Sequence, residues 1–202
     1  EIVSAAKEMG YQIAEGVRLG GRTVASEQDG VFCYSTRQPL GVVGIITPWN
    51  FPFNVVSRKA IPALMAGNTA VFKPASFTPL TGVHYTELLN EAGVPPGVFN
   101  LVTGRGSSIG DALVEHPSIR AVTFTGSTAV GRAIERKAVA HGAKTQMEMG
   151  GKNPAIVLDD ADLDLAVDAI ALAAYACAGQ WCTSTSRVIA VEGIADVLTE
   201  RL

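Results

Sequence analysis

The chain has 202 residues, of which 48% are hydrophobic, and its formal net charge is −3. A chain of this size can bury one good core, and it can also form part of something larger. It has no basic block and no aromatic-basic interleave, which argues against a nucleic-acid-binding protein. The longest apolar stretch, Leu163 to Gly179, is interrupted by Asp164 and Asp168 and falls short of the roughly 20 residues that a membrane span needs.

The cysteines and histidines indicate a reducing compartment and no metal centre. Cys33, Cys177 and Cys182 form no CxxC pair, and an odd number of cysteines without framework spacing fits the cytoplasm better than a secreted protein. No histidine has a cysteine or a paired carboxylate at ligand spacing, so we expect no metal site. Nothing at the N-terminus resembles a signal peptide. We therefore expect a cytoplasmic protein.

The N-terminal part predicts one helix and two strands. Residues 1 to about 19 place apolar side chains at intervals of three and four, which predicts a helix that ends at Gly20-Gly21. Residues 31–38 alternate like a half-exposed strand. The apolar run Val42–Ile46 predicts a buried strand, of the kind found in parallel sheets, that ends at the turn 47–52. The apolar helix positions are Ile2, Ala5, Ala6, Met9, Ile13, Ala14 and Val17.

The middle of the chain repeats one order of elements: a short strand, a turn and a helix. Such alternation predicts an α/β fold, a Rossmann-like parallel sheet with helices on both faces. Ligands of these sheets bind beyond the carboxyl ends of the strands, so the turns that follow the strands are candidate cofactor sites. The predicted strands are 69–73, 99–103 and 121–124, and the helices that follow them are about 79–92, about 109–115 and from Thr128 to about 140.

The last quarter predicts a further strand and helix. The strand covers residues 155–158, and the helix runs from Ala161 to about Cys177 with Asp159 or Asp160 as its cap. The chain begins inside a helix pattern and stops where the pattern of another helix opens, so we expect a fragment of a longer protein or a trimmed one.

Two glycine-rich turns are candidate phosphate sites. The first, Gly104 to Gly110, reads GxGxxxG and matches the dinucleotide fingerprint only weakly. The second, Gly126 to Gly131, has the glycines of a P-loop but continues with Arg132-Ala133 in place of Lys-Ser/Thr, which excludes a kinase or ATPase interpretation. Gly126 and Ser127 nevertheless open a helix whose free N–H groups favour a phosphate. The alternative is an ordinary helix N-cap by Ser127 or Thr128.

Cys182 and Glu148 have the local settings of catalytic residues. Cys182 follows an apolar helix and precedes four hydroxyl residues and Arg187, a setting that can lower a thiol pKa and leave the thiol reachable. The alternative is a half-buried structural cysteine. Glu148 lies between Met147 and Met149, an apolar setting that could raise its pKa toward that of a general base. Its alternative is an ordinary surface carboxylate.

These pieces occur together in the order and spacing of one family, and the chain resembles the aldehyde dehydrogenase superfamily over nearly its whole length. The resemblance is specific because several separate motifs carry it. They are Thr47-Pro48-Trp49-Asn50-Phe51-Pro52, Gly67-Asn68-Thr69 through Lys73-Pro74-Ala75-Ser76, Phe124-Thr125-Gly126-Ser127-Thr128, Glu148-Met149-Gly150-Gly151-Lys152-Asn153-Pro154 and Gly179-Gln180-Trp181-Cys182.

The resemblance implies a catalytic role for three residues. Cys182 would attack the aldehyde as a thiolate, and the Asn50 amide and the Cys182 backbone N–H would hold the oxyanion of the thiohemiacetal. After hydride transfer to the nicotinamide of NAD or NADP, Glu148 would activate the water that hydrolyses the thioester. The product would be a carboxylic acid.

The resemblance also implies the cofactor contacts. Lys73 would reach the adenosine ribose, Ser127 the pyrophosphate, and Trp49 with Gly126 would line the groove. Ser76 stands where NAD-preferring relatives often carry a glutamate that would repel a 2′-phosphate, so we expect NADP to be accepted. The other expected cofactor contacts are Thr47, Asn50, Ala75, Gly106, Gly110 and Met149.

The residues of these motifs resemble most those of bacterial semialdehyde dehydrogenases, especially the enzymes that act on 2,5-dioxopentanoate (α-ketoglutaric semialdehyde). Succinate semialdehyde or another aldehyde is the alternative substrate. A reductase that handles an acyl-thioester would lack the glutamate base, and a non-enzymatic homologue would lose the nucleophile or the base. The retention of Cys182, Glu148 and Asn50 argues against both, although an inactive fragment stays an alternative.

The family's organisation implies two domains. Residues 1–150 would form the NAD(P)-binding domain, with residues 27–40 as part of an arm that pairs between subunits. Residues 151–202 would begin a truncated catalytic domain. The parent protein would accordingly be a homodimer or homotetramer.

Overall fold

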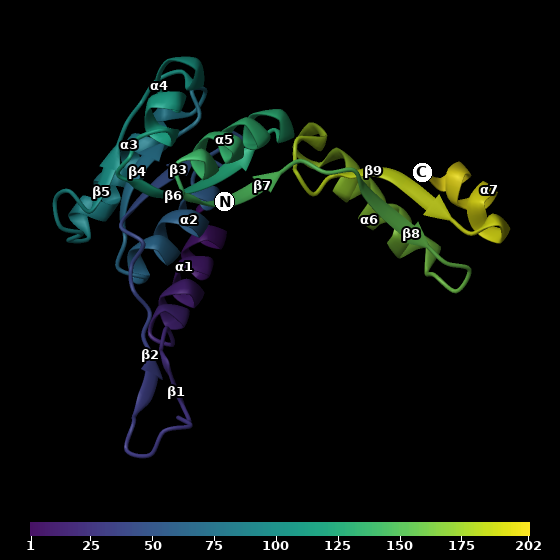
Figure 1. Ribbon diagram of the computed structural model, residues 1–202. Helices are drawn as coiled ribbons and strands as arrows, with labels where there is room; N and C mark the ends of the chain where they lie inside the picture. Colours follow the sequence, from purple (N-terminus) through teal and green to yellow (C-terminus); the bar gives the residue numbers. More distant parts are fainter. The chain divides into compact units, whose positions relative to one another are not determined.

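The chain divides into two compact units, Glu1–Glu148 and Met149–Leu202. Figure 1 shows this computed structural model, which describes residues 1–202. None of its helices has the length and apolar content needed to cross a membrane.

A five-stranded sheet of order β5-β4-β3-β6-β7 forms the centre of the first unit (Figure 1). Strand β3 pairs in parallel with β4 and with β6, and β4 pairs in parallel with β5. These strands are short β-branched and apolar runs, which suit a sheet covered on both faces. The bounds are β3 Val42–Ile46, β4 Thr69–Lys73, β5 Phe99–Leu101, β6 Ile119–Gly126 and β7 Lys144–Met149.

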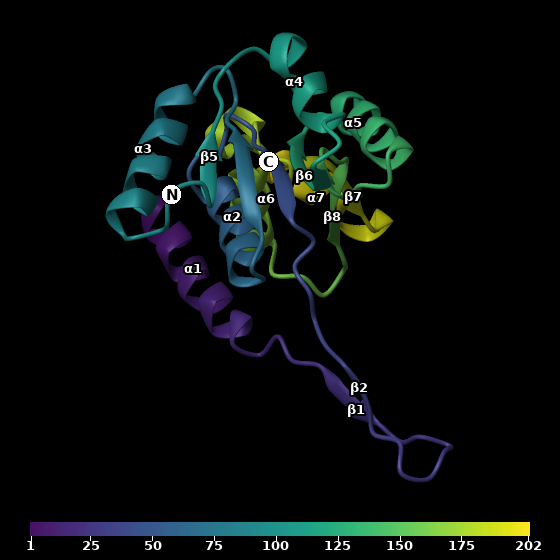
Figure 2. The same cartoon turned by 60° about the vertical axis from the view of Figure 1, so that its left-hand side comes forward.

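Helices cover both faces of this sheet, as the sequence predicted. Because parallel crossovers are right-handed, α2 and α3 lie on one face, and α4 and α5 lie on the other (Figures 1 and 2). Several boundaries differ from the prediction, since α4 begins earlier, at Gly106, β6 is longer at both ends, and β5 ends at Leu101 and not at residue 103. The helices are α2 Asn54–Met65, α3 Pro79–Glu91, α4 Gly106–Val114 and α5 Thr128–Ala140.

Helix α2 and strand β7 have no counterpart in the sequence prediction. Helix α2 follows Pro52 and contains Pro62, which hide its periodicity, but Val56 and Ala60 are fully buried in the main core. Packing of one apolar face therefore stabilises a helix that the local sequence pattern does not predict. Strand β7 is too polar on one face to be recognised as a buried strand from its sequence.

The main core lies between the sheet and its covering helices. Tyr85 of α3 is 1% exposed and packs edge-on against Phe72 and tilted against Phe99. This burial raises the pKa of Tyr85 to about 12. Aromatic packing of this kind adds to the stabilisation from buried area. The buried members of the core are Val43, Ile45, Val56, Ala60, Ala70, Phe72, Tyr85, Phe99 and Ala121.

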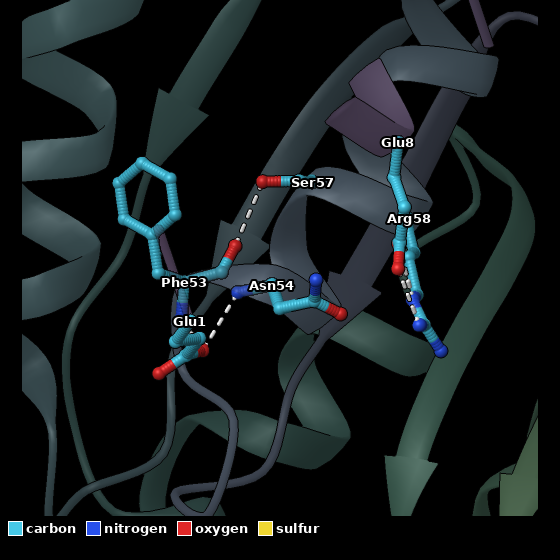
Figure 3. A network of polar contacts seen from close by, with 6 residues as sticks. All are labelled: Glu1, Glu8, Phe53, Asn54, Ser57 and Arg58. Carbon is cyan, nitrogen blue, oxygen red and sulfur yellow. Dashed lines mark hydrogen bonds and ion pairs between the residues drawn. The ribbon is translucent and has the colours of Figure 1, made fainter. Parts of the chain in front are cut away.

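The N-terminal helix α1 (Ile2–Gly16) packs on α2 and caps it (Figure 3). Glu1 Oε1 accepts hydrogen bonds from the backbone N–H groups of Phe53 (2.9 Å) and Asn54 (2.8 Å), at the positive end of the α2 dipole. Arg58 donates to both carboxylate oxygens of Glu8, each at 2.6 Å, and these hydrogen bonds lower the pKa of Glu8. Polar contacts thus fix α1 at the start of α2.

The predicted extent of the N-terminal elements needs correction. Helix α1 ends at Gly16, and of its expected apolar face only Ala5 is fully buried, while Met9 is partly buried against the main core. The strand expected at 31–38 is the shorter β2 (Cys33–Ser35), which pairs antiparallel with β1 (Arg22–Val24). This ribbon extends away from the sheet in Figure 1 and exposes Phe32 and Tyr34.

The second unit is a small α/β unit with its own core. Strands β8 and β9 pair in parallel, and Val157, Ile170 and Leu198 are buried between them and the helices. Strand β9 and most of α7 were not predicted, since the hydroxyl-rich segment after Cys182 has the composition of a loop. The elements are β8 Asn153–Val157, α6 Leu163–Tyr175, a 3₁₀ helix Ala176–Gly179, β9 Thr185–Ala190 and α7 Glu192–Arg201.

Helix α6 is capped by Asp162, and the prediction of Asp159 or Asp160 is wrong. The helix begins at Leu163, and Asp162 Oδ1 accepts hydrogen bonds at 3.1 Å from the N–H groups of Asp164 and Leu165. Asp159 and Asp160 lie in the turn before the helix, out of the capping position.

We predict that Asp162→Ala lowers the free energy of unfolding by about 1 kcal/mol, because it leaves two N–H groups of the first turn without an acceptor. Urea denaturation followed by circular dichroism measures the change. Asp160→Ala is the matched control and should have no effect. An equal loss from both substitutions would contradict the assignment of the cap.

Candidate active site

The loops after β3, β4 and β6 lie at one edge of the sheet. Because these neighbouring strands are parallel, their carboxyl ends, Ile46, Lys73 and Gly126, point the same way. The chain order also reverses between β3 and β6, which is where parallel α/β sheets form their ligand crevice. Most predicted cofactor residues of the first unit end or follow these strands, while Gly106 and Gly110 lie in α4, after β5.

A cavity of about 510 Å³ lies beside this edge, over α4 and α5. Three of the predicted cofactor residues, Lys73, Gly106 and Gly110, are among its lining residues. A Cβ built on Gly106 or Gly110 would meet no atom within 4 Å, so both backbones face open space. The full lining is Ile46, Lys73, Gly106, Ser107, Gly110, Asp111, Ala129, Val130, Ala133, Ile134 and Lys137. A mainly apolar slot that is also lined by the charged residues Lys73, Asp111 and Lys137 fits a nucleotide base and sugar.

Two buried polar groups mark the same edge. Thr47, 3% exposed, ends the buried run of β3, and its Oγ1 has no hydrogen-bond partner in the structure. Lys73, 5% exposed, donates from Nζ to the carbonyl of Pro74 at 3.1 Å, and its burial lowers its pKa. Buried polar groups are normally satisfied, so the unpaired Thr47 hydroxyl suits a bound polar ligand. These residues fit the NAD or NADP that the sequence resemblance implies.

Ser127 is the N-cap residue of α5, but its side chain makes no capping hydrogen bond. The alternative expected for Ser127, an ordinary helix N-cap, is therefore correct for the position of its backbone. It is wrong for its side chain, which does not cap the helix. The first N–H groups of α5 follow directly after Gly126, where a Cβ would meet the Phe124 ring at 2.5 Å. An uncapped helix start of this kind favours an anionic group.

Ser76 lies outside the cavity lining and joins two loops. Its Oγ donates to the carbonyl of Gly104 at 3.2 Å, which ties the loop after β4 to the loop after β5. Ser76 itself is exposed, and its neighbour Ala75 is half-buried. Neither residue lines the cavity. The residue after Gly104 is Arg105, at the start of α4.

Trp49 and Asn50 lie in the turn between β3 and α2. Trp49 is 43% exposed and Asn50 is half-buried. The capped start of α2 at Asn54 follows closely, so the contact with α1 also constrains this turn.

Glu148 lies near the end of β7 and is exposed, so the apolar setting expected for it is wrong. Side chains alternate between the two faces of a strand, which places Met147 and Met149 on the face opposite to Glu148. Its same-face neighbour is Gln146, whose Nε2 donates to Glu148 Oε1 at 3.0 Å.

Lys59 of α2 is a buried cation that the sequence interpretation missed. It is 7% exposed, and its Nζ donates to Thr123 Oγ1 at 2.8 Å and to Gln146 Oε1 at 3.0 Å. Burial lowers its pKa to about 8, and the negative charge of Glu148 partly opposes this shift. No sequence signal could have found Lys59, because it belongs to the helix that was not predicted.

In the second unit, Cys182 lies in the exposed loop between the 3₁₀ helix and β9. Asn153 holds this loop, since its Nδ2 donates to the carbonyls of Cys182 (2.8 Å) and Ser184 (3.1 Å). Just before the loop, Cys177 and Ala178 have φ values of 52° and 55°, which are strained for residues other than glycine. The sequence interpretation included Asn153 in a motif but gave it no role.

The candidate catalytic residues fall in both units. Asn50 and Glu148 belong to the first unit, while Cys182, with the half-buried Met149, belongs to the second. No group of three or more His, Cys, Asp or Glu side chains is arranged to hold a metal ion.

We predict that the stability of the protein rises with pH through the titration of Lys59. Its pKa is about 8 in the folded protein and 10.5 for an unperturbed lysine, so the unfolded chain binds more protons between these values. Between about pH 8 and about pH 10 the free energy of unfolding should gain about 2 kcal/mol from this group. Urea denaturation of the wild type and of Lys59→Met at several pH values measures this gain. If the free energy of unfolding changes equally with pH in both proteins, the prediction is contradicted.

Comparison with known proteins matches this arrangement to one family. The profile of the aldehyde dehydrogenase family matches residues 1–202. The chain is 50% identical over 192 residues to the α-ketoglutaric semialdehyde dehydrogenase of Bacillus subtilis, covering 95% of this chain and 39% of that protein. It is 42% identical to the NADP-dependent succinate-semialdehyde dehydrogenase of Escherichia coli, covering 100% of this chain and 42% of that protein.

A solved structure agrees with the sequence comparison. The NAD-dependent aldehyde dehydrogenase of Sinorhizobium meliloti superposes with a TM-score of 0.92 at 46% identity, over 95% of this chain and 38% of that one. The chain therefore spans about two fifths of the length of the relatives it matches. The family profile and these likenesses show that the chain belongs to the aldehyde dehydrogenase family.

Proposed function

We propose that a full-length protein containing this chain oxidises an aldehyde to a carboxylic acid with NAD or NADP, using Cys182 as the nucleophile. The observation that carries this proposal is the exposed Cys182 loop, held at its backbone by Asn153, in a chain of the aldehyde dehydrogenase family. The exposed thiol is reachable by a substrate, as a nucleophile must be.

The proposed reaction has two halves. The Cys182 thiolate forms a C–S bond with the aldehyde carbon, and the Asn50 amide and the Cys182 backbone N–H donate to the resulting oxyanion. NAD or NADP, when held by the first unit, would supply the acceptor for the hydride that the thiohemiacetal loses, and Cys182 would then carry a thioester. Glu148 then takes a proton from water, whose oxygen attacks the thioester carbon; the acid and the Cys182 thiolate separate.

The first unit would supply the cofactor site. Lys73, Gly106 and Gly110 would hold the adenosine part in the cavity, and Thr47 with the N-terminus of α5 at Ser127 would bind polar groups. The remaining predicted contacts, Trp49, Asn50, Ala75, Ser76, Gly126 and Met149, stay part of this proposal. Under it, residues 1–150 form the NAD(P)-binding domain and 151–202 begin the catalytic domain.

We propose 2,5-dioxopentanoate as the substrate, supported by the name of the Bacillus subtilis relative at 50% identity. Succinate semialdehyde is the alternative, supported by the Escherichia coli relative. We also propose that residues 27–40, which include β2, are part of an arm that pairs between subunits of a homodimer or homotetramer, since this segment extends from the sheet and exposes Phe32 and Tyr34. A cytoplasmic location fits the three free cysteines.

Glu148→Gln should trap the acyl-enzyme of a full-length protein that contains this chain. The amide cannot take the proton of the attacking water, so we expect thioester hydrolysis to slow by about a hundredfold or more. Intact mass spectrometry after mixing with cofactor and aldehyde would show the added acyl group on Cys182.

Cys182→Ala is the control and should show neither the acyl group nor an absorbance change from reduced cofactor. A reductase that excludes water from its thioester would hydrolyse nothing in either form, and Glu148→Gln would leave its rate unchanged. A non-enzymatic protein would give no cofactor reduction in the wild type.

Ser76→Glu should shift the cofactor preference toward NAD. A carboxylate at this position would repel a 2′-phosphate, so we expect NADP to bind at least about tenfold more weakly while NAD binding holds or improves. Fluorescence titration of both cofactors measures the two affinities. A wild type that binds NADP more than tenfold more weakly than NAD would contradict the role given to Ser76.

A further inference from the structure

We propose that Gln146 is a positioning residue for Glu148, with its side-chain amide fixed by Thr123 and Lys59. The inference rests on the proposed function, in which Glu148 is the general base of thioester hydrolysis. It concerns a polar chain that runs from the buried Lys59 to the Glu148 carboxylate and joins α2, β6 and β7.

The chain of contacts is continuous within the first unit. Lys59 Nζ donates to Thr123 Oγ1 (2.8 Å) and to Gln146 Oε1 (3.0 Å). The Thr123 hydroxyl donates to the same Gln146 oxygen, and Gln146 Nε2 donates to Glu148 Oε1 at 3.0 Å. Gln146 and Glu148 lie two residues apart on β7, so both side chains emerge on the same face of the strand.

These contacts decide which way the Gln146 amide faces. An amide has one acceptor oxygen and one donor nitrogen, and a flip exchanges them. Lys59 can only donate, so the amide atom beside its ammonium must be the oxygen. The nitrogen is then the atom that faces Glu148, where it donates to a carboxylate. A flipped amide would place nitrogen against the ammonium and oxygen against the carboxylate, which is unfavourable at both ends.

The burial of Lys59 strengthens the hydrogen bonds that link it through Gln146 to Glu148. Lys59 is 7% exposed, so its electrostatic interaction with the Gln146 oxygen is screened less than it would be in water. Hydrogen bonds in series polarise one another, so a charged donor on the Gln146 oxygen strengthens the N–H that reaches Glu148. The burial of Lys59 therefore orders an exposed side chain on a neighbouring strand.

The consequence for catalysis is the placement of one carboxylate. With Oε1 of Glu148 held by Gln146, its other oxygen, Oε2, is the one left to take the proton of the water. A base acts only from a fixed position within hydrogen-bond reach of that proton. Removal of the Gln146 donor should thus slow thioester hydrolysis and spare the earlier steps.

The test uses Gln146→Glu in a full-length protein that contains this chain. The new carboxylate keeps an acceptor for Lys59 and Thr123 but presents oxygen to Glu148, while Gln146→Leu removes the polar contacts altogether. Lys144→Gln, on the same face of β7, is the matched control. Rapid mixing followed by intact mass measures formation and decay of the acyl-enzyme separately.

We expect both Gln146 variants to slow acyl-enzyme decay by about tenfold, with its formation unchanged and Lys144→Gln like the wild type. Unchanged decay in variants that fold, or equal slowing of formation and decay, overturns the inference. Glu148→Gln distinguishes the base role of Glu148 from the positioning role of Gln146. If the acyl-enzyme of Glu148→Gln decays slowly while that of both Gln146 variants decays at the wild-type rate, only the positioning role fails. If Glu148→Gln itself decays at the wild-type rate, the base role fails and the inference fails with it.

Discussion

The parallel pairing of β3 with both β4 and β6 is the constraint on which the first unit depends. It points the strand ends Ile46, Lys73 and Gly126 to one edge of the sheet, and Ile46 and Lys73 line a cavity there together with residues of α4 and α5. Side chains of β3, β4, β5 and β6 pack against α2 and α3 in the main core, and this close packing holds the strands in register. The cofactor site proposed here is therefore a result of topology, with the individual residues supplying the chemistry.

Helix α2 connects this sheet to the proposed base. Its start is capped by Glu1, one face contributes Val56 and Ala60 to the core, and Lys59 reaches β6 and β7. A buried ammonium is costly unless its hydrogen bonds are satisfied. Lys59 has two oxygen acceptors, and the Glu148 charge opposes the lowering of its pKa. The same helix thus serves packing, the Asn50 turn and the polar chain to Glu148.

The second unit holds the proposed nucleophile, Cys182, through backbone contacts of its loop. The Cys182 loop has no regular secondary structure, yet Asn153 at the start of β8 binds two of its carbonyls, and Trp181 N–H donates to Ser184 Oγ. An exposed loop fixed by its backbone leaves the thiol itself unobstructed. The motif that contains Glu148 and Asn153 therefore contributes to both units, because the boundary between them falls after Glu148.

The sequence by itself determined the α/β class, most strands and helices, and the motifs that carry the family resemblance, because these depend on local periodicity and spacing. Only the tertiary structure decided the rest. Helix α2 forms through packing despite Pro62, Asp162 caps α6 because the helix begins at Leu163, and the strand alternation separates Glu148 from Met147. Lys59, Thr123 and Gln146 are far apart in sequence, and pairing of distant segments is what local patterns cannot encode.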